Sequence, residues 1–157
     1  MAKTVLVADD NETIRREICR VLLRETECEI CGEAHHGLDA IEKAQQLHPN
    51  SIILDLSMPV MNGIDAARAL RARMPTVPII MFPLYVDPFL KEELRSAGVA
   101  DVVSKSEIFP CSHKKRGPFF IKALLDGTSR LACRTSLAPT FRCVPCRNLT
   151  PQNVQSF

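Results

Sequence analysis

Three stretches of the sequence decide the fold: Val5-Leu-Val-Ala-Asp-Asp10, Ser51-Ile-Ile-Leu-Asp55 and Ala100-Asp-Val-Val-Ser-Lys105. Each is a largely apolar run that ends in a charged residue, and helix-patterned residues separate the runs. Apolar runs of this length between helices are typical of buried parallel strands. In an open parallel sheet, ligands bind beyond the carboxyl ends of the strands. We therefore expect three carboxylates and one ammonium group to share a single crevice.

The carboxylates of Asp9, Asp10 and Asp55 would repel one another strongly without a positive charge between them. A divalent cation with oxygen ligands is the usual means of neutralising such a group. Lys105 adds one positive charge at the same edge of the sheet. The pattern therefore predicts a Mg²⁺ site that handles a phosphoryl group.

Strand and helix patterns alternate through the first hundred residues. Strands are predicted at residues 5–8, 28–31, 51–54, 78–82 and 100–103. The helices between them have one apolar face, with Asn11 as a predicted N-cap, Pro88 in a first turn and Gly98 just past a last turn. Repeats of this length predict an α/β fold with a doubly wound, five-stranded parallel sheet between two layers of helices.

The composition is that of a soluble globular protein, with 46% apolar and 24% charged residues among 157. No apolar run approaches the ~18–20 residues that span a bilayer, and the first residues lead into a strand without a signal-peptide pattern. The seven cysteines are odd in number and scattered, which does not favour a secreted disulfide framework. We therefore expect a cytoplasmic protein without membrane contact.

The character of the chain changes near residue 108. Residues 1–107 hold 12 Lys and Arg against 17 Asp and Glu, whereas residues 108–157 hold eight against one. The helix pattern also fails after Lys105 and returns only over residues 118–126. We expect one domain over residues 1–126 and a disordered tail over residues 127–157 that is too short for a helix-turn-helix output domain. A reading-frame change or a degraded gene end would also explain this tail.

Three motifs together resemble the receiver domain of bacterial response regulators. They are Val5-Leu-Val-Ala-Asp-Asp-Asn11, Ile52-Ile-Leu-Asp-Leu-Ser-Met-Pro-Val-Met-Asn-Gly63 and Ser104-Lys105, in the order and spacing of that family. The resemblance covers residues 3–107 and implies the flavodoxin-like three-layer sandwich. It implies a two-component phosphorelay protein that catalyses only its own phosphorylation and dephosphorylation.

The resemblance also implies roles for individual residues. Asp55 would accept a phosphoryl group from a sensor histidine kinase or a phosphotransfer protein, and Lys105 would bind a phosphoryl oxygen. Asp10 and Asp55 would ligate Mg²⁺ directly, Asp9 through a water, and Ser57 through its backbone carbonyl. The output would be contact with a downstream protein whose identity the sequence does not give. The chemistry agrees with the residues, because phosphoryl transfer requires mainly alignment and charge neutralisation.

Three positions depart from the family pattern. Receivers place a Thr or Ser after the fourth strand, where this chain has Pro83, which offers neither a hydroxyl nor an N–H. The aromatic position of the fifth strand falls on Val102, and Ser106 stands where a proline often follows the lysine. A lost hydrogen bond to the phosphoryl group is worth ~1.5–3 kcal/mol. The alternative function is therefore a pseudo-receiver, an interaction module with impaired switching.

Other candidate sites are weaker. Cys143 and Cys146 have a zinc-like spacing, with Cys133, Cys111 and His113 as further candidate ligands, but no second close pair accompanies them. Cys28 and Cys31 fall inside a predicted strand, so their side chains should point to opposite faces. The basic run at residues 113–116 is short for a nucleic-acid site, and DNA binding is not expected. An enzyme with a phospho-aspartyl intermediate would need substrate-binding residues that the sequence does not offer.

Overall fold

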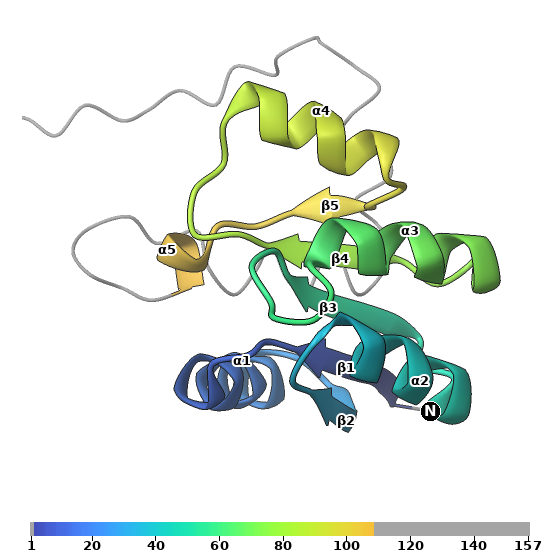
Figure 1. The fold of residues 1–157 in the computed structure, drawn as a ribbon. Coiled ribbons are helices and arrows are strands. Elements are labelled where there is room, and N and C mark those ends of the chain that lie inside the picture. Colours follow the sequence, from blue (N-terminus) through green and yellow to red (C-terminus); the bar gives the residue numbers. More distant parts are fainter. Residues whose placement is uncertain (1, 109–157) are drawn as a thin grey trace, which may run out of the picture.

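The computed structural model describes residues 2–108. Strands and helices alternate along this part of the chain (Figure 1). The strands are β1 (Lys3–Ala8), β2 (Cys28–Ala34), β3 (Ser51–Asp55), β4 (Ile79–Phe82) and β5 (Asp101–Val102). The helices are α1 (Glu12–Glu25), α2 (Gly37–Leu47), α3 (Gly63–Arg73), α4 (Pro88–Ser96) and α5 (Lys105–Ile108).

The five strands form one sheet in the order β2-β1-β3-β4-β5, and every neighbouring pair is parallel. Helices α2, α3 and α4 cover one face, and α1 and α5 lie on the other (Figure 1). This is the predicted doubly wound, three-layer sandwich, so the predicted fold class is confirmed. The chain leaves β1 towards one edge and then returns to add β3 on the other side, which makes the carboxyl ends of β1 and β3 the topological switch point.

Alternation along the strands divides the core into two parts. The larger part lies under α2, α3 and α4 and takes from the strands Leu6, Ala8, Ile52, Leu54, Ile79 and Met81. The smaller part lies under α1 and takes Val5, Val7, Ile53, Ile80 and Phe82. All five residues of β3 are buried, because this central strand is covered on both faces. Its last residue, Asp55, is therefore held on a rigid element.

Side-chain caps fix where the helices begin. Asn11 accepts hydrogen bonds from the backbone N–H groups of Thr13 and Ile14, which confirms it as the N-cap of α1. Gly98 has a φ of +84° and follows the C-cap of α4, as expected for a helix-ending glycine. The backbone N–H groups of Gly98 and Val99 bond back to Arg95 and Leu94, which completes a Schellman motif.

Some boundaries differ from the sequence prediction. Strand β2 continues to Ala34 rather than residue 31, with a bulge opposite Val5 and Leu6 that the apolar pattern does not mark. A short helix, α5, begins at Lys105 itself, where we expected the helical pattern to fail. The predicted helix at residues 118–126 and the tail at 127–157 lie outside the described residues. So do Cys111, His113 and the other candidate zinc ligands, and the predicted domain boundary stays a prediction.

Gly63 lets the start of α3 pass directly behind the end of β3. A Cβ atom at Gly63 would lie 2.1 Å from the backbone oxygen of Asp55. The N–H of Gly63 donates to the carbonyl of Leu56. At Gly32 a Cβ would instead meet the terminal methyl group of Leu47 at 2.6 Å. A backbone atom of the central strand cannot move away, whereas a side-chain methyl group can rotate.

Gly63→Ala is therefore expected to destabilise the protein by at least about 3 kcal/mol, at the upper end of overpacking effects. Gly32→Ala is the matched control and should cost about 1 kcal/mol, because only the side-chain methyl groups of Leu47 and Leu6 must shift. Urea unfolding of both variants measures the difference. Equal costs at the two positions would show that the close approach behind Asp55 is not the constraint described.

Candidate functional site

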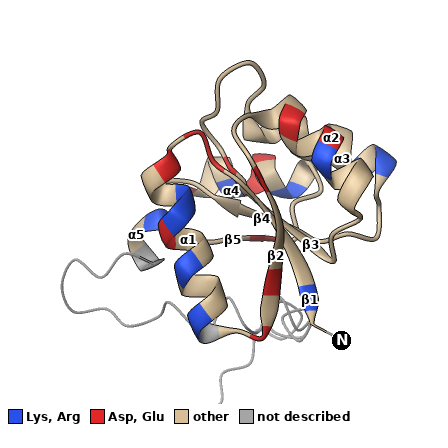
Figure 2. Ribbon diagram, turned by 90° about the horizontal axis from the view of Figure 1, so that it is seen from below, with Lys and Arg blue, Asp and Glu red and all other residues tan. Residues whose placement is uncertain are grey.

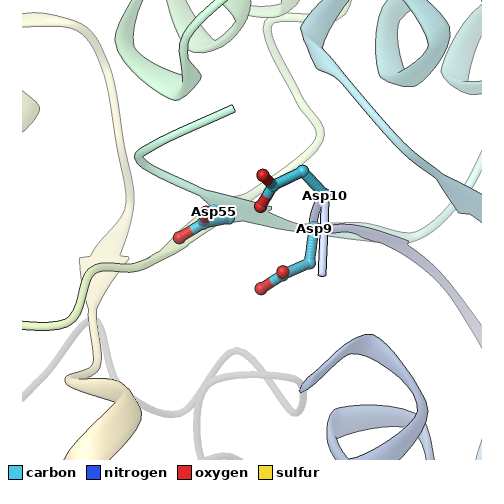
Figure 3. A group of neighbouring side chains, drawn as sticks. All are labelled: Asp9, Asp10 and Asp55. Carbon is cyan, nitrogen blue, oxygen red and sulfur yellow. The ribbon is translucent and has the colours of Figure 1, made fainter. Parts of the chain in front are cut away.

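The three predicted carboxylates meet at the switch point of the sheet. Asp55 is the last residue of β3, and Asp9 and Asp10 directly follow β1, the neighbouring strand. Their carboxyl groups converge on the same space (Figure 3), with one oxygen from each within 4.8 Å of the others. Asp9 and Asp55 are buried, whereas Asp10 is exposed. The structure therefore brings these three carboxyl groups together at the carboxyl edge of the sheet, as expected.

Lys105 brings its ammonium group into the same cluster from the start of α5. Its Nζ lies 2.7 Å from Oδ2 of Asp9 and 2.8 Å from Oδ1 of Asp55. The lysine is only 7% exposed, so both ion pairs are largely shielded from water. One positive charge faces three carboxylates, which leaves a formal charge of −2 when all three are ionised. The site is therefore poised to attract a cation.

Burial sets the protonation equilibria of the cluster. Burial raises the pKa of Asp9 above 3.8, although Lys105 and the Asn11 N–H oppose this shift. Burial would lower the pKa of Lys105, but the carboxylates of Asp55 and Asp9 beside its ammonium group outweigh that effect and raise the pKa above 10.5. The lysine therefore stabilises the fold at neutral pH, and this contribution is lost only as the pH rises through its raised pKa.

The backbone of Asp9 is fixed by several partners. Its N–H donates to the carbonyl of Ala34, and its Oδ1 accepts from the N–H of Asn11 at 2.9 Å. Its carbonyl accepts from Nη1 of Arg15 at 2.8 Å, and Nε of Arg15 pairs with Glu33 at 2.7 Å. Arg15 is buried, whereas the other arginines of α1 are exposed. Figure 2 shows how basic residues recur along α1. Nothing in the sequence marks Arg15, because its position five residues after Asp10 and next to Arg16 is that of an ordinary surface arginine.

The donor set suits a hard cation. In the described part of the chain, Oδ2 of Asp9 is buried and accepts no well-directed hydrogen bond, so its close approach to Lys105 is mainly an attraction of charges. A buried carboxylate oxygen in this state is readily completed by an ion. Carboxylate oxygens from three residues are the ligands that Mg²⁺ favours. Ser57, the predicted carbonyl ligand, is exposed two residues after Asp55.

Two of the atypical positions, Pro83 and Val102, lie directly after β4 and in β5. Asp55 pairs in register with Phe82, the last residue of β4, and the buried Pro83 follows directly. The carbonyl of Pro83 accepts a hydrogen bond from the N–H of Lys105 at 2.9 Å. Val102 pairs with Met81 and packs against the larger core. Both residues therefore occupy the places that the sequence resemblance assigned to the hydroxyl and aromatic residues.

The cysteines of β2 do not form a metal pair. Cys28 packs in the core under α1, and Cys31 packs against the core on the opposite face. This confirms that their side chains point to opposite sides of the sheet. Among the described residues, the acidic trio is the one group with a ligand arrangement for a metal. No helix in residues 2–108 has the length and apolar character needed to cross a membrane.

Replacing Lys105 with Met is expected to lower the free energy of unfolding by about 3 kcal/mol at neutral pH, because two buried carboxylates lose their counter-charge. The pKa of Asp9, which burial already raises, then lies further above its unfolded value because Lys105 no longer opposes the shift. The folded variant therefore binds extra protons, and its deficit should shrink as the pH falls towards roughly 4. Urea unfolding across this range measures the effect.

Lys91→Met, at an exposed lysine of α4, is the control. A deficit that does not depend on pH would contradict the account.

Comparison with known proteins supports the same family. The family model for the response regulator receiver domain matches residues 5–109. A protein-glutamate methylesterase/protein-glutamine glutaminase from Pseudoalteromonas translucida is 45% identical over 82 residues, covering 52% of this chain and 21% of the relative. A Vibrio vulnificus protein of the same description is 39% identical over 107 residues, covering 67% and 28%. The chain thus spans less than a third of the length of these relatives.

Solved structures share the fold. A two-component response regulator of the LuxR family from Aurantimonas gives a TM-score of 0.70 at 22% identity, covering 81% of this chain and 87% of that one. The response regulator domain of Thermotoga maritima CheB gives 0.63 at 24% identity, covering 83% and 93%. At these identities the likeness supports the fold alone. The fold, the acidic cluster and the match over residues 5–109 together show that the chain belongs to the response regulator receiver domain family.

Proposed function

We propose that this domain is a Mg²⁺-dependent phosphoacceptor of a two-component phosphorelay, with Asp55 as the residue that is phosphorylated. The observation that carries the proposal is the position of Lys105 Nζ, 2.7 Å from Asp9 and 2.8 Å from Asp55 at the carboxyl edge of the sheet. An ammonium group held there neutralises negative charge at the place where a phosphoryl group would arrive. Membership of the receiver family supports the same function.

The acidic trio would hold the metal ion. Asp10 and Asp55 would be direct ligands, Asp9 would act through a water, and Ser57 would contribute its carbonyl. When bound, Mg²⁺ supplies neutralising charge for the phosphoryl oxygens. The chain itself keeps Asp55 at the end of a buried strand and fixes Asp9 through Asn11 and Arg15. Both acids are thereby oriented before a ligand arrives, which avoids an ordering cost at binding.

The transfer would be a single displacement at phosphorus. A carboxylate oxygen of Asp55 attacks the phosphorus of a phosphohistidine on a sensor kinase or phosphotransfer protein. The new O–P bond forms as the P–N bond breaks, and the bonding electrons leave with the imidazole. Lys105 exchanges part of its contact with Asp55 for a contact with a phosphoryl oxygen. Its positive charge therefore stays next to the negative charge that develops on the phosphoryl group. Hydrolysis by water would later return Asp55 to its carboxylate.

The scope of the proposal is the receiver domain. The curated relatives carry methylesterase and glutaminase descriptions, but the match to this chain spans 21% and 28% of their lengths. We propose that the described residues catalyse only phosphorylation and dephosphorylation of Asp55. A downstream protein would recognise the phosphorylated domain, and we propose neither DNA nor a membrane as its partner.

A second candidate function, a pseudo-receiver, is favoured by Pro83. The residue that follows β4 offers no hydroxyl and no N–H to a phosphoryl group. A coupling weakened by ~2 kcal/mol would reduce the shift between two states by about thirtyfold. The pseudo-receiver would bind its partner protein without being phosphorylated. The intact charge cluster of Asp9, Asp55 and Lys105 argues against it, because a binding module has no need for buried charges of this kind.

Incubation with a small-molecule phosphodonor and Mg²⁺ is expected to add one phosphoryl group to the parent protein and none to Asp55→Asn. Intact mass before and after addition of a chelator measures both the transfer and its metal dependence. Glu92→Gln, at an exposed position of α4, is the matched control and should be modified like the parent. Failure of every donor to modify the parent would leave the pseudo-receiver as the better account.

A further inference from the structure

The β4–α4 loop and the first turn of α4 expose a group of apolar side chains, and the loop begins directly after Phe82, the register partner of Asp55. Leu84 is 60% exposed, Tyr85 80% and Phe89 87%, and Val86 lies between them in the chain. In receivers of the usual pattern, a hydroxyl after β4 ties this loop to the phosphoryl group. Here Pro83 cannot make that bond. A phosphoryl group on Asp55 therefore needs another physical connection if it is to alter the loop.

Ser104, the residue before α5, and Lys105, its first residue, hold this part of the chain in place. They bond to the carbonyls of Leu84 and Pro83. The N–H of Lys105 donates to the carbonyl of Pro83 at 2.9 Å. The hydroxyl of Ser104 donates to the carbonyl of Leu84 at 3.0 Å. The first bond continues the β4–β5 ladder, in which Val103 donates to Met81. The second uses a side chain and has no counterpart in the ladder.

The direction of the Ser104 bond is fixed by proton counting. A serine hydroxyl has one proton and two acceptor positions. Ser104 gives its proton to Leu84, so in its 2.7 Å contact with the Ser106 hydroxyl it must accept. The N–H of Ser106 also points to the Ser104 oxygen, at 3.3 Å. Ser106 therefore supplies two donors that a proline at this position would lack.

We propose that Ser104, oriented by Ser106, is a positioning residue that couples phosphorylation of Asp55 to the loop carrying Tyr85. This inference rests on the proposed phosphorylation of Asp55. The link is Lys105, whose side chain contacts Asp9 and Asp55 while its backbone N–H and the side chain of the preceding Ser104 are held to the loop. New phosphoryl oxygens on Asp55 draw the ammonium group away from Asp9. The carbonyls of Pro83 and Leu84 then move with the backbone of residues 104 and 105.

The chain contains its own reporter for this movement. Tyr85 is the only tyrosine among the 157 residues, and the chain has no tryptophan. Tyrosine fluorescence therefore reports on the β4–α4 loop alone. Iodide quenching and anisotropy can be measured with and without Mg²⁺ and beryllofluoride, a mimic of the phosphoryl group. The variants are Ser104→Ala, which removes the hydroxyl, Ser104→Thr, which keeps it, and Ser106→Ala, which removes one of the two donors that orient it.

Beryllofluoride is expected to change Tyr85 quenching in the parent and in Ser104→Thr. In Ser104→Ala the change should fall about fivefold, the effect of one lost hydrogen bond, and in Ser106→Ala it should fall by less. Intact mass after treatment with a phosphodonor is measured on the same samples and should be equal in all four proteins. An undiminished Tyr85 response in a phosphorylated Ser104→Ala variant would overturn the inference alone. No phosphorylation of the parent would overturn the proposed function, and the inference with it.

Discussion

The structure depends on the burial of like charges around a single ammonium group. Asp9 and Asp55 lose almost all contact with water, and Lys105 reaches both from another element. Removing charged groups from water is costly, and the pairing offsets that cost only while all three side chains stay together. The arrangement therefore constrains the ends of β1 and β3 and the start of α5. The remaining negative charge attracts a cation to this edge of the sheet, which is what the proposed phosphoacceptor function requires.

The order of the strands is what brings the charges together. Because β1 and β3 are neighbours and parallel, residues that follow one strand lie beside the residue that ends the other. The crossing of α3 behind Asp55, through Gly63, leaves no room for the strand to shift. The route of the chain places Lys105 at the same edge after β5. Sequence positions 9, 55 and 105 thus become neighbours through topology rather than through any local motif.

Much of this was predictable because strand-end charges and parallel topology both leave clear patterns. The apolar runs before Asp10, Asp55 and Lys105 predicted the sheet, and Asn11 and Gly98 predicted helix ends. The extension of β2 to Ala34 was not predictable, because the added residues Gly32, Glu33 and Ala34 do not form an apolar run. Nor was the role of Arg15, since burial of its side chain depends on the carbonyl of Asp9 and on Glu33, which only the folded chain brings near.

The atypical residues Pro83 and Ser106 are explained better together than apart. Pro83 removes a hydroxyl from the end of β4, whereas Ser106 supplies donors that direct Ser104 onto the next carbonyl of the same loop. Both lie within the network of hydrogen bonds that surrounds Lys105. In the proposed coupling, the bonds from Ser104 and Lys105 to the loop take the place of the hydroxyl contact that Pro83 cannot make. The position of Tyr85 at that surface makes the difference measurable.

The central claim is that the excess negative charge of Asp9, Asp10 and Asp55 forms a site for a divalent cation, and calorimetric titration with Mg²⁺ tests it most directly. The parent should bind one ion. Asp10→Asn and Asp9→Asn should each weaken the Mg²⁺ affinity by about tenfold or more. The first removes a charged direct ligand, and the second removes the carboxylate that would act through a water. Glu92→Gln should bind like the parent. Binding that is equally strong in all four proteins, or absent in the parent, would contradict the account.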